Sequence, residues 1–142
     1  MNESELEELY LDAPLLPLPR GAFDGNTLRR LSSPGAMHPL YRSLEWIGFE
    51  ALSWGIDFDG PCWFFANPLL RAGKFEPRPG RSRWRPTDAI GLHYYPSRLP
   101  YLVRSALYDE VKPLSDDLCL GIGGVNQVVG DGDHFFFVLS RR

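Results

Sequence analysis

Alternating runs of apolar and polar residues, separated by turn residues, occupy most of the chain after residue 60. Such alternation predicts β-strands, because successive side chains of a strand point to opposite faces of a sheet. The predicted strands and hairpin arms are residues 20–31, 62–66, 69–76, 82–85, 89–95, 101–112, 118–127 and 134–141. Gly130-Asp131-Gly132, between the last two strands, is a strong hairpin signal.

Short links between successive strands favour an antiparallel meander, since parallel neighbours need long crossover connections. A meander loses its exposed edges when it closes into a barrel. We therefore predict a mainly β protein, an antiparallel up-and-down β-barrel with a short N-terminal helix. An open sheet rolled around one helix is the alternative. At 142 residues the chain suits one domain over residues 1–142, with a helix and linker over 1–14 and the barrel over 20–142.

Residues 3–12 have helical rather than strand periodicity. Leu6, Leu9 and Tyr10 stand at i, i+3 and i+4, which gives a short amphipathic helix one apolar face. The prolines that follow prevent regular structure and favour an extended connector.

Two other regions have a different character. The run PRPGR at residues 77–81 has turn chemistry, so we expect a hairpin turn at Pro79-Gly80. Residues 32–39 have the composition of a loop. Residues 40–53 fit a short helix, and residues 48–58 look more like a strand, so both interpretations stay open here.

Two adjacent acids, Asp109 and Glu110, interrupt the apolar alternation of residues 101–112. If that segment is one strand, Asp109 faces inward, and Glu110 shares a solvent face with Arg104 and Lys112. An inward carboxylate would bind a polar group of a ligand or act as a general base, because an apolar cavity raises its pKa. The structural alternative is that Asp109 caps the following turn or pairs with an arginine.

Histidines supply the other candidate chemistry. His93 and Tyr95 share one face of a predicted strand with Gly91, and we expect them to be polar groups of a pocket. The alternative is that these tyrosine and histidine side chains form a row on the solvent-facing side of the barrel. His134 opens the last strand, which is apolar on both faces, so one face needs cover from the N-terminal helix or a second subunit.

Charge and composition limit the possible partners. The net charge is −3, yet six of the 15 basic residues lie between positions 71 and 85, interleaved with Phe75 and Trp84. Basic and aromatic residues together can hold single-stranded nucleic acid or a phosphate. A solvated hairpin has the same composition, and the overall acidity argues against nucleic acid as a partner.

The chain has the features of a cytoplasmic protein. Its N-terminus is acidic, whereas a secretory signal is basic and then apolar. No apolar run approaches the ~20 residues that span a bilayer, so we expect no membrane association. Cys62 and Cys119 are expected to be buried thiols rather than a disulfide.

Motifs for common cofactors are missing from the sequence. It has no dinucleotide fingerprint, no P-loop and no nucleophile elbow. The three histidines, His38, His93 and His134, lack metal-ligand spacing. We therefore predict no cofactor and no metal.

The segment RGAFDGNTLRRL resembles the G-x-W strand that opens lipocalin-like barrels, with Phe23 at the tryptophan position. The later runs LHYYPSRLP, LYDEVKPLSDDLCLGIGGV and HFFFVLSRR resemble the closing strands of small bacterial lipocalin-like proteins of the calycin type. The resemblance covers the last third of the chain and this opening motif. It implies a barrel with a hydrophobic cavity, and it carries over no catalytic residue.

These observations favour a barrel that binds a small hydrophobic or amphipathic molecule. The expected ligand-binding residues are Trp54, Trp63, Phe65, His93, Tyr95, Tyr101 and Asp109. One alternative is a small enzyme of the cyclase or isomerase type, with Asp109 and His93 as the candidate catalytic residues. The other is a protein-interaction module without a ligand, and a homodimer is possible in each case.

Overall fold

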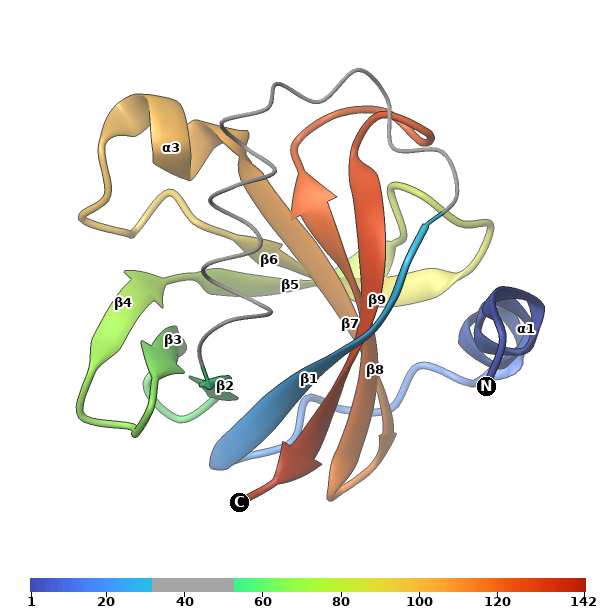
Figure 1. The fold of residues 1–142 in the computed structure, drawn as a ribbon, viewed down its shortest axis with the longest axis horizontal. Coiled ribbons are helices and arrows are strands. Elements are labelled where there is room, and N and C mark those ends of the chain that lie inside the picture. Colours follow the sequence, from blue (N-terminus) through green and yellow to red (C-terminus); the bar gives the residue numbers. More distant parts are fainter. Residues whose placement is uncertain (32–52) are drawn as a thin grey trace.

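The computed structural model of the chain describes residues 1–31 and 53–142. Within these residues, nine strands form one antiparallel sheet that curls into a nearly closed barrel (Figure 1). The strand order across the sheet is β4-β3-β2-β1-β9-β8-β7-β6-β5. The strands are β1 (Ala22–Arg30), β2 (Trp54–Asp57), β3 (Cys62–Phe65), β4 (Arg71–Lys74), β5 (Glu76–Arg81), β6 (Asp88–His93), β7 (Leu107–Ser115), β8 (Leu118–Val125) and β9 (Asp133–Arg141).

The connectivity is an up-and-down meander. Strands β1 to β4 pair in chain order, as do β5 to β9, and β9 returns to pair with β1. The two edge strands, β4 and β5, are separated by a single residue, Phe75. The predicted antiparallel up-and-down barrel with a short N-terminal helix is therefore confirmed.

The N-terminal helix α1 (Glu3–Asp12) lies against the outside of the barrel (Figure 1). The Asn2 side chain accepts a hydrogen bond from the Glu5 backbone N–H at 2.9 Å, and the Glu5 carboxylate accepts one from the Asn2 backbone N–H at 2.7 Å. This capping box satisfies two N–H groups that the helix itself leaves unpaired. Leu6 and Tyr10 are the buried residues of the helix.

Two apolar clusters make up the core. The inner cluster lies inside the barrel, and its aromatic members include Trp54, Trp63, Tyr94 and Phe137. The outer cluster lies between the sheet and α1, where the Tyr10 ring meets the Phe136 ring edge-on at 6.1 Å. The predicted cover over the second apolar face of β9 is thus the N-terminal helix.

The predicted turn at Pro79-Gly80 is wrong, because these residues lie inside strand β5. Strand β5 is an edge strand that pairs with β6 only, and an edge tolerates prolines because one side of its backbone needs no donor. The turn comes at residues 82–87, where the Ser82 N–H donates to the Thr87 carbonyl at 2.8 Å.

The predicted strand over residues 101–112 is wrong in its first half. Tyr101–Ala106 forms a short helix, α3, and strand β7 begins at Leu107. The pairing of β6 with β7 ends at His93 and Tyr108, so the earlier residues have no ladder beside them. The Ser105 hydroxyl bonds the Tyr101 carbonyl at 2.6 Å within that helix.

The loop expected at residues 32–39 and nearly all of the ambiguous segment 40–53 lie outside the described residues. Of the strand considered for residues 48–58, the described part contains β2. No helix in the described part of the chain is long and apolar enough to cross a membrane.

Candidate functional site

The alternation of β6, β7 and β8 determines which side chains enter the barrel. Asp109 of β7 stands between Leu92 of β6 and Gly123 of β8 in the ladder. Its neighbours along β7 on the same face, Leu107 and Val111, both pack in the inner cluster. Asp109 therefore faces the interior, as the alternation predicts, and only 2% of its surface is exposed.

Asp109 is held by hydrogen bonds from two elements. The Tyr94 hydroxyl donates to Oδ2 at 2.5 Å, and the Gly124 N–H donates to Oδ1 at 3.2 Å. Burial raises the pKa of Tyr94 well above its ordinary value, and the negative charge of Asp109 raises it further. The phenol thus stays protonated and remains a donor to the carboxylate.

Aromatic rings surround this polar pair. The Trp63 ring meets the Tyr94 ring edge-on at 5.5 Å, and Trp54 lies 5.8 Å from Trp63. Trp54 also meets Phe137 edge-on at 5.5 Å. The result is a carboxylate–phenol pair inside a barrel lined by large apolar surfaces.

Glycines of β8 make room for these rings. A Cβ on Gly121 would stand 2.2 Å from the Phe137 ring. One on Gly123 would stand 2.5 Å from the Phe135 ring and 2.9 Å from Asp109 Oδ1. Both distances are too short for real atoms, so these glycines leave space beside bulky neighbours.

The expected ligand-binding residues divide into two groups. Trp54, Trp63 and Asp109 are buried in the interior, and Phe65 is partly buried against the same cluster. The other group does not line the interior.

Tyr95 is 53% exposed and Tyr101 is 66% exposed, the latter on α3. His93 belongs to the outer face of β6, where its ring lies 5.4 Å from Tyr108. The structure therefore places the two candidate catalytic residues, His93 and Asp109, on opposite faces of the sheet. Tyr94 is the interior residue that the sequence interpretation missed, although it shares the inward alternation of Ile90 and Leu92.

Glu110 lies on the outer face as predicted, but it is completely buried rather than solvated. Its Oε1 accepts from the hydroxyls of Tyr10, at 3.0 Å, and Ser82. Its Oε2 accepts from the Arg83 N–H and the Tyr108 hydroxyl, both at 3.1 Å. Donors from α1, the turn at 82–87 and β7 thus converge on one carboxylate.

Lys112 is also buried beneath α1 instead of facing solvent. Its Nζ donates to the carbonyls of Tyr10, at 2.7 Å, and Ala13, at 2.9 Å, and to the Thr87 hydroxyl at 2.6 Å. Burial lowers the pKa of the ammonium group. The contacts satisfy carbonyls at the C-terminal end of α1, where a cation also suits the helix dipole.

Arg85 joins α1 to the last strand. Its guanidinium makes two hydrogen bonds to the Glu7 carboxylate, at 2.7 and 2.6 Å, and one to Asp133 at 2.8 Å. His134 follows Asp133 in β9. It is buried, and its Nε2 lies 2.8 Å from the Asp131 carbonyl oxygen. These polar residues tie the outer elements together.

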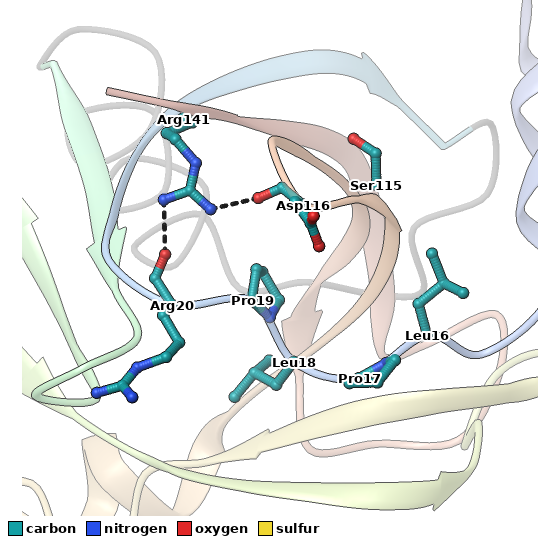
Figure 2. Close-up of a pocket in the computed structure, with 8 residues that line it drawn as sticks. All are labelled: Leu16, Pro17, Leu18, Pro19, Arg20, Ser115, Asp116 and Arg141. Atoms are coloured by element: carbon teal, nitrogen blue, oxygen red, sulfur yellow. Dashed lines mark hydrogen bonds between the residues drawn. The ribbon is translucent and has the colours of Figure 1, made fainter.

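A surface pocket of about 440 Å³ opens between the proline-rich connector and the β7–β8 turn (Figure 2). Its lining residues are Leu16, Pro17, Leu18, Pro19, Arg20, Ser115, Asp116 and Arg141. Arg141 donates to the carbonyls of Arg20, at 2.8 Å, and Asp116, at 2.5 Å, and to the Asp117 carboxylate at 2.5 Å. Its guanidinium is therefore used to join the connector to the turn.

The cysteines are free and buried. Burial raises the pKa of Cys62, and it raises the pKa of Cys119 to about 12. Such thiols are protonated at neutral pH and are poor nucleophiles. Within residues 1–31 and 53–142, no three His, Cys, Asp or Glu side chains group closely enough to hold a metal ion.

No family model and no curated protein sequence matches the chain. A crystal structure of a protein from Thermomonospora curvata is similar to it, with a TM-score of 0.53 and 19% sequence identity. The similarity covers 100% of this chain and 88% of that one. The two proteins share a fold. At this identity, the likeness concerns the fold and nothing further.

Proposed function

We propose that the barrel binds a small hydrophobic or amphipathic molecule in its interior, as the resemblance to lipocalin-like, calycin-type proteins implies. The observation that carries the proposal is the buried Asp109–Tyr94 pair among aromatic rings. Binding sites for small molecules combine apolar walls with few, well-placed polar groups. The tryptophans would contact the apolar part of the ligand, and Asp109 would accept a hydrogen bond from its polar end.

The first test is a titration with the neutral apolar fluorophore N-phenyl-1-naphthylamine. We expect saturable binding, with energy transfer from Trp54 and Trp63 to the bound dye. Trp63→Leu should weaken binding about fivefold, because one aromatic contact is worth about 1 kcal/mol. Leu69→Ala, a change at a residue 90% exposed, is the matched control and should bind like the native protein.

Native mass spectrometry of freshly purified protein complements the dye. A retained molecule of defined mass would identify the natural ligand class. If no molecule is retained and the dye binds without saturation, or equally well to Trp63→Leu, the interior is not a ligand site.

An enzyme of the cyclase or isomerase type is the second candidate, favoured by the direct contact between a carboxylate and a phenol. Asp109 would act as the base toward an enclosed substrate. The retained molecule separates the two functions. A carrier returns it unchanged, whereas an enzyme converts it and Asp109→Asn binds it without converting it.

A further inference from the structure

A second group of polar residues lies on the outer face of β5, β6 and β7, across the sheet from Asp109. In the ladder, Arg78 of β5 pairs with Gly91 of β6, and His93 of β6 pairs with Tyr108 of β7. Positions 91 and 93 share a face because strand side chains alternate. Arg78, His93 and Tyr108, from three adjacent strands, therefore lie in one patch on the outer face.

Gly91 allows two of the side chains to converge. A Cβ at this position would stand 2.9 Å from the Tyr108 hydroxyl oxygen and 3.1 Å from His93 Nε2. Any larger residue would push these polar atoms apart. The imidazole and the phenol thus lean toward each other over the bare backbone of β6.

Two arginines flank this point. The Arg83 guanidinium lies over the Tyr108 ring, with Cζ 4.1 Å from the centroid. It makes no ion pair within the described part of the chain. Arg78 pairs with Glu76 at 3.0 Å, and both side chains of this pair are 54% exposed. The Arg83 guanidinium thus stacks on an aromatic ring, and that of Arg78 is held by a solvent-exposed partner.

We propose that Arg78, Arg83 and His93 form a binding site for a phosphate group on the outer face of the barrel. Guanidinium groups hold phosphate oxygens through paired, charge-assisted hydrogen bonds. The imidazole Nε2 adds a donor from a third direction when it is protonated. The donors come from β5, the turn at 82–87 and β6, which suits a tetrahedral anion better than a planar carboxylate.

The electrostatic environment of His93 agrees with this geometry. Partial burial lowers the pKa of His93, and the positive charges of Arg78 and then Arg83 lower it further, whereas Glu76 opposes them. Among the other groups that face it, the Tyr108 hydroxyl donates a hydrogen bond to the buried Glu110 carboxylate. A bound phosphate would offset the two arginine charges and raise the pKa of His93. Phosphate binding and protonation of His93 should therefore strengthen each other.

The test is a titration of the full chain with inorganic phosphate, monitored through the NMR signals of the His93 imidazole. The variant His93→Gln assigns these signals. We expect a saturable shift of the imidazole signals and a rise in the pKa of His93. Sodium chloride at equal ionic strength should produce neither. Arg83→Gln and Arg78→Gln should each weaken binding about tenfold, the loss of one charge-assisted contact.

Arg81→Gln is the matched control. Arg81 lies on the same strand but makes an exposed contact with Asp88 at 3.5 Å, so its removal should leave phosphate affinity within about twofold. Two further titrations distinguish between the two possible sources of the phosphate group. O-phosphoserine represents a soluble phosphomonoester, and phosphatidylcholine vesicles containing phosphatidic acid represent a lipid headgroup.

The proposal would be overturned if phosphate shifted the His93 signals no more than sodium chloride does. Variants at Arg78 and Arg83 that bind as the native protein does would also overturn it. Because Arg78 is exposed on an edge strand, its substitution keeps the test valid even if Arg83→Gln disturbs the packing on Tyr108. The outcome is independent of ligand binding inside the barrel, since the two sites occupy opposite faces of the sheet.

Discussion

At the scale of single residues, two adjacent carboxylates have separate environments. Asp109 faces the barrel interior and bonds Tyr94, whereas Glu110 faces α1 and accepts four hydrogen bonds. A buried charge is tolerated only when donors replace the water it loses. The alternation along β7 predicts the two directions. Alternation could not predict the burial of Glu110, because the residue that covers this carboxylate, Tyr10, lies 100 positions away in the sequence.

The first stability prediction concerns Glu110→Leu. The change leaves the Tyr10 and Tyr108 hydroxyls and the Arg83 N–H without their buried acceptor. We expect a loss of roughly 3 kcal/mol in the free energy of unfolding, measured by urea denaturation at pH 7. Glu110→Gln, which keeps one acceptor oxygen, should lose less. The exposed Glu8→Gln serves as the control, and equal stability of Glu110→Leu and the native protein would contradict the role of this carboxylate.

At the scale of elements, periodicity predicts α1 and most strands correctly. It fails where the neighbouring element decides the outcome. Residues 101–106 alternate like a strand but form α3, because β6 ends before it can pair with them. Residues 77–81 have turn chemistry but lie in a strand, because β5 is an edge. In the interior, the facing of Asp109 was predictable from alternation, whereas the facing of Tyr95 and Tyr101 depends on a loop and a helix that alternation cannot describe.

The junction between α1 and the barrel gives a prediction at this scale. Lys112→Met removes the donor to the carbonyls of Tyr10 and Ala13 and to Thr87. The C-terminal end of α1 should then open more often, because its carbonyls lose a buried partner. Native-state hydrogen exchange should show faster exchange in α1 and little change in β7, β8 and β9. Lys74→Met, at an exposed position, is the control, and unchanged exchange in α1 would contradict the prediction.

At the scale of the whole molecule, the barrel has one seam. Strands β4 and β5 are edges, and the chain passes from one to the other through Phe75. The Phe75 N–H donates to the Pro61 carbonyl at 2.9 Å, and its side chain is buried. Exposed strand edges invite pairing with other chains. The packing of Phe75 thus closes the seam between β4 and β5, which do not pair with each other in the sheet that the described residues form.

The last prediction tests this closure with Phe75→Ala. The ring meets Phe58 edge-on at 6.4 Å and Tyr94 edge-on at 6.0 Å, so its loss removes contacts from both sides of the seam. We expect the free energy of unfolding to fall by about 3–5 kcal/mol, the range for deleting a buried aromatic side chain. Phe75→Leu should recover part of the loss, and the exposed Leu69→Ala should lose almost nothing. Urea denaturation measures all three variants, and size-exclusion chromatography reports self-association through the freed edges. A loss below about 1 kcal/mol for Phe75→Ala, well under the cost of a buried cavity, would mean that the seam is held by other residues.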